Sequence, residues 1–263
     1  MPRSQNIVFI GGAPRSGTTL LRAIVGTGAN IACGPELRVI PALCTLAANI
    51  SATSAAALTA GFGVDALRVD QMTAGAIQQF LTPLQQRAGA SRVAEKTPAN
   101  ALHFPALRRM FPDAPIVSIV RDGRDVVSSL LRMDWRDDRT GAPMPATKSA
   151  RAGAELWAAS VAADERMRGD KHFYSLRYEN LVADPAREIS ALYEFLEEPT
   201  PNLALFHQHA FDPLEGENEA SAARVAEPID TASVGRWRRD LSPAQLDDIE
   251  AAAGPWLRRY GYV

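Results

Sequence analysis

Lysine and cysteine are both scarce in this chain of 263 residues. The two cysteines, Cys33 and Cys44, are too few for a disulfide framework, and we interpret both as reduced thiols. Only three residues are lysines, so arginine supplies nearly all of the 28 basic side chains. Thirty acidic residues outweigh them, and the net charge of −2 lacks the basic excess of a nucleic-acid-binding protein. We therefore expect no nucleic-acid partner.

Long hydrophobic runs are also absent. No stretch approaches the roughly 20 apolar residues of a transmembrane helix, and the apolar run at residues 7–10 is too short for a signal peptide. We therefore expect a cytoplasmic protein with no membrane partner. The composition, 46% hydrophobic and 22% charged, excludes a disordered chain, a collagen and a coiled coil.

Strand-like and helix-like segments alternate along the chain. Short apolar runs predict strands at residues 7–10, 92–95, 115–120 and 172–176. Apolar residues at helical spacing predict helices at residues 18–27, 73–88, 100–111, 125–133, 150–168, 186–197 and 242–260. The second of these helices contains Pro83, a residue type that can break a helix. The alternation predicts one α/β domain over residues 1–263, a P-loop-like three-layer sandwich in which helices flank a central parallel β-sheet.

Residues 11–19 join the first predicted strand to the first predicted helix and are rich in glycine. Gly12 and Gly17 have the spacing of a phosphate-binding loop, in which backbone N–H groups and the helix N-terminus attract an anion. The lysine of that motif is replaced by Thr18, so ATP would lack the cation that neutralises its terminal phosphates. The other donors in the loop are Arg15, Ser16 and Thr19.

A second anion site is expected where the central strand ends. Arg121 follows that strand, and Ser129 lies further along the next helix, so the two can hold a phosphate together. A kinase-like strand would instead end in a carboxylate for Mg²⁺, and Asp122 and Asp125 keep that alternative open. Two anion sites indicate a nucleotide that is phosphorylated at two places.

These motifs resemble the sulfotransferase superfamily, and most closely the tyrosylprotein sulfotransferases. PRSGTT at residues 14–19 is similar to the family's 5′-phosphosulfate loop, and VRDGRDVVSSLL at 120–131 to its 3′-phosphate motif. Similarity continues through residues 33–41, 95–98, 178–182 and 221–262. The resemblance implies 3′-phosphoadenosine 5′-phosphosulfate (PAPS) as the cofactor and the 3′,5′-bisphosphate PAP as its product.

The resemblance also assigns roles to matching residues. Those implied to bind the cofactor are Arg15, Ser16, Gly17, Thr18, Thr19, Arg121, Ser129, Tyr178 and Arg236. Glu36 matches the catalytic base, Lys96 the lysine that contacts the bridging oxygen, and Arg38 an arginine beside the acceptor. Arg15 and Ser221 complete the implied catalytic set, Ser221 through a gap-free match across 221–236. His103 is the rival base, and the sequence identifies no metal ligands.

The sequence therefore predicts a sulfotransferase that works in line and without a metal. Its partner would be an acceptor hydroxyl, on a peptide tyrosine or on a small compound, and a homodimer is left open. The alternatives are phosphoryl transfer by a P-loop kinase or nucleotide hydrolase, and non-catalytic binding of a nucleotide bisphosphate. The family's usual partner for Cys33 in a disulfide falls at Ala94, so that bridge cannot form.

Overall fold

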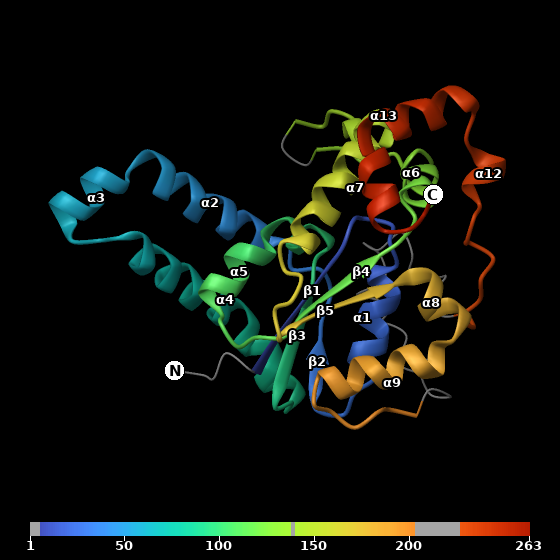
Figure 1. The fold of residues 1–263 in the computed structure, drawn as a ribbon. Helices are drawn as coiled ribbons and strands as arrows, with labels where there is room; N and C mark the ends of the chain where they lie inside the picture. The colour runs from blue at the N-terminus through green and yellow to red at the C-terminus, as the bar shows by residue number, and fades with distance from the viewer. Residues whose placement is uncertain (1–5, 138–139, 203–226) are drawn as a thin grey trace.

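A computed structural model describes residues 6–137, 140–202 and 227–263, which form a sheet covered by helices (Figure 1). Five parallel strands lie in the order β2-β3-β1-β4-β5. Their bounds are β1 Ile7–Gly11, β2 Ile31–Cys33, β3 Arg92–Lys96, β4 Ile116–Val120 and β5 Phe173–Arg177. The four predicted strands and the parallel α/β class are confirmed. β2 was not predicted, because a strand of only three residues gives too short an apolar run to recognise.

One face of the sheet is covered by α1 (Thr18–Gly26), α8 (Tyr178–Ala183) and α9 (Pro185–Phe195). Leu21 and Ile24 of α1 and Leu192 of α9 are almost fully buried against strand residues such as Val8 and Val117. This packing fixes the first turn of α1 directly beyond the carboxyl end of β1, which is where the glycine-rich loop lies.

The opposite face carries α2 (Val39–Thr53), α4 (Ala66–Ala88), a 3₁₀ turn (Pro98–His103) and α5 (Phe104–Met110). The helix predicted over residues 73–88 is confirmed as part of α4, which is 23 residues long and continues through Pro83. Ile77 and Leu81 are buried just before the proline, and Leu84 packs on the same core after it. Packing on both sides outweighs the backbone hydrogen bond that the proline removes.

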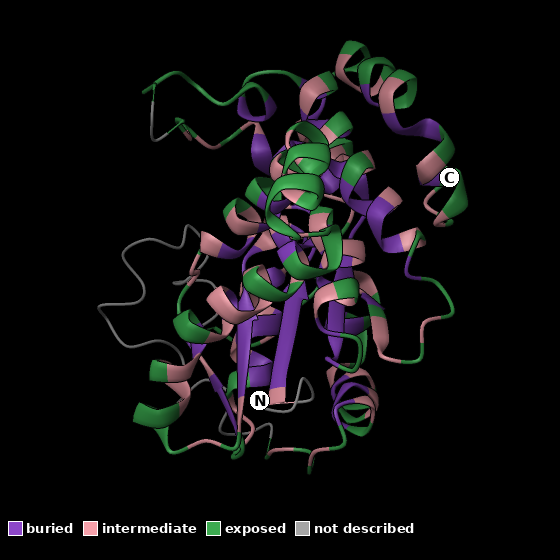
Figure 2. Cartoon of the chain, turned by 90° about the vertical axis from the view of Figure 1, so that its left-hand side faces the viewer, coloured by how far each residue is buried: buried purple, intermediate pink, exposed green. Residues whose placement is uncertain are grey.

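A helical arm projects from this face (Figure 1). It is formed by α2, α3 (Ala55–Phe62) and α4, and α3 has no buried residue. Figure 2 shows the buried strands behind these largely exposed helices. In the described part of the chain no single helix is long and apolar enough to cross a membrane. Taken together, α2 and α3 have that length and composition, but the pair is bent by 77°.

A third hydrophobic cluster lies beside the sheet, between α6 (Gly123–Leu130), α7 (Ala150–Glu165) and α13 (Pro243–Arg259). Its largest member is Trp157, which is fully buried and donates a hydrogen bond from Nε1 to the backbone oxygen of Arg121 at 2.9 Å. The cluster thereby fixes the backbone where β4 ends. The short helix α12 (Trp237–Asp240) and the turn Pro145–Thr147 pack near it.

Candidate active site

The glycine-rich loop is shaped by positions that only glycine fills easily. Gly17 has φ of 100°, and a Cβ there would lie 2.6 Å from the Tyr178 ring. Arg15 also has a left-handed backbone, with φ of 72°, which is uncommon for a residue with a side chain. Arg15, Gly17, Thr18 and Thr19 line a cleft of about 850 Å³. The loop therefore offers backbone and side-chain donors to one cleft.

Ser16 differs from its neighbours in the loop. Its side chain is buried and its Oγ has no hydrogen-bond partner among the residues that the structure describes, while its backbone N–H donates to the Ala13 oxygen at 3.1 Å. Ser16 lies instead beside a small space below the loop, together with Ser118 and Trp157. The structure thus places four of the five predicted loop residues on the cleft and turns the fifth toward the core.

Three guanidinium groups meet at the loop. Arg15 donates from Nε to Ser129 Oγ at 3.0 Å, and Arg121 donates from Nη1 to the Arg15 backbone oxygen at 3.2 Å. Burial lowers the pKa of the Arg15 guanidinium, and the positive charges of Arg121 and Arg236 lower it further. Cations crowded in this way favour a ligand that carries several negative charges.

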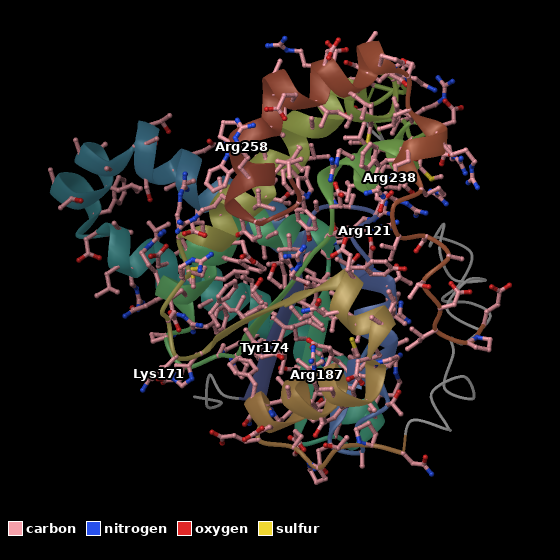
Figure 3. All side chains as sticks on the ribbon, turned by 45° about the vertical axis from the view of Figure 1, so that its right-hand side comes forward. Arg121, Lys171, Tyr174, Arg187, Arg238 and Arg258 are labelled. Carbon is pink, nitrogen blue, oxygen red and sulfur yellow. The ribbon has the colours of Figure 1, made fainter. Side chains whose placement is uncertain are left out.

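Arg121 comes from the carboxyl end of β4 (Figure 3), as the sequence predicts. Its guanidinium lies 4.6 Å from the centre of the Tyr178 ring and donates to the backbone oxygen of Ser233 at 2.5 Å. Tyr178 and Ser233 share a hydrogen bond of 2.6 Å between their hydroxyls. The segment around Ser233 is thereby tied to the second predicted anion site.

Asp125 holds the same C-terminal segment. Its fully buried carboxylate accepts hydrogen bonds from the backbone N–H groups of Gly235 at 2.7 Å and Trp237 at 2.9 Å. Asp125 thus serves a backbone-binding role in place of the metal-binding role that the kinase alternative gives it. Arg236, held between these two N–H groups, lines the cleft and pairs with Asp240 at 3.1 Å.

Glu36 lines the cleft and is bound from behind by Lys96, which is not itself among the lining residues. The Lys96 ammonium is fully buried and donates to Glu36 Oε1 at 2.6 Å. Arg38 Nε lies 3.5 Å from the other carboxylate oxygen, and the Arg38 side chain is 59% exposed. Glu36 therefore lies between a buried cation and an exposed one. His103, the rival base, is not among the residues that line the cleft.

Another part of the cleft wall is the loop between α6 and α7. Arg136 and Pro143 form an isolated antiparallel bridge, and Trp135, Arg136 and Met144 face the cleft. Residues 227–230 line the cleft as well. Ser221 lies outside the described residues.

Similarity to known proteins points to the same kind of site. The model of the sulfotransferase family matches residues 7–202. The chain belongs to the sulfotransferase family. The predicted enzyme class, a transferase of sulfuryl groups, is therefore confirmed.

Similar sulfotransferases are known from animals. Protein-tyrosine sulfotransferase A of Caenorhabditis elegans is 28% identical over 99% of this chain and 68% of its own length. Protein-tyrosine sulfotransferase 1 of Homo sapiens is 30% identical over 97% of this chain and 69% of its own.

Solved sulfotransferase structures share the fold. The sulfotransferase domain from the curacin biosynthetic pathway has a TM-score of 0.63 at 20% identity, covering 95% of this chain and 97% of that domain. Mouse sulfotransferase SULT7A1, solved in complex with PAP, has a TM-score of 0.55 at 17% identity, covering 97% and 85%. The predicted P-loop-like three-layer architecture is therefore confirmed.

Two residues of this sulfotransferase's cleft region were not predicted as site residues. Ser233 contacts both Arg121 and Tyr178, and its signal in the sequence is only its place just before the matched Gly235–Trp237 segment. Asp125 was weighed only as a metal-binding carboxylate. Each acts on a partner more than 50 residues away, which no local spacing could reveal.

Proposed function

We propose that this sulfotransferase moves the sulfuryl group of PAPS to an acceptor hydroxyl, with Glu36 as the general base. The observation that carries the proposal is that Glu36 lines the same cleft as the arginine cluster while its carboxylate is bound by the buried Lys96 ammonium. The names of the similar animal proteins and the PAP in the mouse SULT7A1 structure support the donor and the reaction class.

The cleft fits a nucleotide with phosphates at both ends of its ribose. Arg15 and the loop residues Gly17, Thr18 and Thr19 would hold the 5′-phosphosulfate, with the N-terminus of α1 behind them. Arg121 and Ser129 would hold the 3′-phosphate. Tyr178 and Arg236, which also line the cleft, would contact the rest of the nucleotide.

Each residue near the transferred sulfuryl group has its own role in the reaction. PAPS supplies a sulfuryl group that is activated by its link to a phosphate. Glu36 accepts the acceptor's proton as the new S–O bond forms and the old S–O bond to the phosphate breaks. Lys96 and Arg15 stabilise the negative charge that grows on the leaving phosphate. Ser221 would donate to the same bridging oxygen.

The acceptor is a tyrosine of a peptide or another phenol or alcohol. Arg38 supports this part of the proposal, because its exposed guanidinium flanks the Glu36 carboxylate where an acceptor must approach. Trp135 and Met144 on the same cleft give an aromatic or aliphatic acceptor an apolar wall.

Binding of PAP alone is the first test. At a hundred times its dissociation constant, PAP should add about 2.7 kcal/mol of stability, which is about 5–10 °C in Tm for a chain of this size. We expect this shift without Mg²⁺ and a much smaller one with ATP. Thermal unfolding with each nucleotide, with and without Mg²⁺, measures it. A shift only with ATP and Mg²⁺ would contradict the proposal and favour phosphoryl transfer.

Replacing Arg121 should remove the preference for the 3′-phosphate. We expect Arg121→Met to weaken PAP about 100-fold and to leave the weak binding of 5′-AMP within about 3-fold, because a paired, desolvated charge is worth 2–5 kcal/mol. Isothermal titration calorimetry with both nucleotides gives the comparison. The exposed Arg187, far from Arg121 in Figure 3, provides the control Arg187→Met. Equal losses for both nucleotides would place the 3′-phosphate elsewhere.

A further inference from the structure

Glu95 is a buried carboxylate next to Lys96 that the proposed reaction does not use. It is the penultimate residue of β3 and is only 3% exposed. Oε1 accepts hydrogen bonds from Thr97 Oγ1 at 2.6 Å and from the backbone N–H of Leu37 at 3.2 Å, and Oε2 accepts from Asn100 Nδ2 at 2.6 Å. Burial raises the pKa of Glu95, and these three hydrogen bonds and the Lys96 charge oppose that rise.

The contacts of Glu95 converge on the turn that carries Glu36. Leu37, which follows Glu36, is held directly. Arg38 is held through Thr97, whose Oγ1 accepts from the Arg38 backbone N–H at 3.1 Å. Arg38 has φ of 57°, a left-handed backbone that a residue with a side chain rarely adopts, so the turn needs such external hydrogen bonds to keep its shape.

Two adjacent residues at the end of β3 therefore bind the turn. Lys96 binds the Glu36 carboxylate, and Glu95 binds the backbone just after it. The same network also reaches the phosphate loop, because Asn100 donates to the backbone oxygen of Ile10 at 3.1 Å and Gly12 donates to that of Pro98 at 3.1 Å. The base and the nucleotide loop are thus held by one buried set of hydrogen bonds.

We propose that Glu95, acting directly and through Thr97, is a positioning residue that holds the Glu36–Arg38 turn in the geometry needed for transfer. The link to catalysis rests on the proposed function of Glu36, whereas the tether itself does not. A carboxylate is required because all three partners are donors. An amide at residue 95 would turn an N–H group toward at least one of them and leave a buried donor unpaired.

Four variants test the proposal. Glu95→Gln and Thr97→Val remove parts of the tether, and Thr97→Ser restores the hydroxyl. Asp164→Asn is the control, because Asp164 is also a buried carboxylate that accepts hydrogen bonds, from Tyr260 at 2.9 Å and Ser175 at 3.2 Å, and it does not line the cleft.

Amide hydrogen exchange, calorimetry and kinetics give three readouts. We expect Glu95→Gln and Thr97→Val to speed exchange at the Leu37 and Arg38 amides at least about 10-fold. With PAPS and either 4-nitrophenol or a tyrosine-containing peptide, kcat should fall about 10- to 100-fold, because small displacements of reacting groups are costly. The Kd for PAP should stay within about 3-fold. Thr97→Ser should behave as the wild type, and Asp164→Asn should change Tm alone.

The outcomes separate the tether from the reaction. Unchanged exchange at Leu37 and Arg38 in Glu95→Gln would overturn the proposal, as would a kcat loss of the same size in Asp164→Asn. Faster exchange in the two tether variants, with no turnover by the wild type, would support the tether and count against the proposed function. Faster exchange with normal kcat would overturn the positioning role.

Discussion

The variant Glu36→Gln should lower kcat for sulfuryl transfer about 100- to 10,000-fold, the range in which general bases contribute. The amide keeps the size of the side chain and its contact with Lys96 but cannot accept the acceptor's proton. Because the nucleotide is held by other residues, the Kd for PAP should stay within about 3-fold. Steady-state kinetics with PAPS and calorimetry with PAP measure the two quantities.

The control for this result is Glu155→Gln, an exposed glutamate of α7 that pairs with Arg151 in its own helix. It should leave kcat unchanged, because exposed ion pairs within a helix contribute little. If Glu36→Gln lowers kcat less than about 10-fold, Glu36 is not the base. In that case the structure leaves its carboxylate the simpler role of a partner for Lys96 and Arg38.

The second large effect is expected for Lys96→Met. Lys96 is fully buried, and a positive charge in such a place interacts strongly with charge that develops on the leaving group. Loss of one group that stabilises a transition state in this way costs about 100- to 1,000-fold in kcat. The measurement is kcat at saturating PAPS, with circular dichroism to confirm the fold.

The exposed Lys171, which lies at the opposite end of the strands from Arg121 in Figure 3, gives the control Lys171→Met. The double variant of Glu36 and Lys96 should cost less than the product of the two single losses, because residues that act as a unit are not additive. A Lys96→Met protein with lowered Tm and full activity would reduce the pair to a structural ion pair.

The sequence predicted those parts of the site whose residues lie close together in the chain or directly follow a strand. Gly12, Gly17 and Arg15 belong to one short loop, and Arg121 directly follows a buried strand, so spacing and strand position were sufficient. The burial of a side chain could not be predicted in this way, because it depends on residues distant in the chain. The sequence alone does not show that Lys96, the last residue of β3, is fully buried and paired with Glu36.

Two further differences have physical causes. The orientation of Ser16 is set by left-handed φ values at Arg15 and Gly17, which the composition of the loop does not specify. The passage of α4 through Pro83 depends on the buried Ile77 and Leu81 and the partly buried Leu84, which were already part of the predicted helix. Tertiary packing on both sides of a proline is not visible in a single sequence.

The position of β1 has a consequence for how the chain reaches this state. β1 is synthesised first, yet both of its neighbours in the sheet, β3 and β4, emerge only after α1, β2 and the three helices of the arm. The apolar residues of β1 can therefore pack only against strands that are distant in the chain. Closing the long chain segments between these strands slows folding. The nucleotide cleft draws on the ends of β1, β3 and β4 together, so we expect PAP binding to appear during refolding only once these three strands have joined.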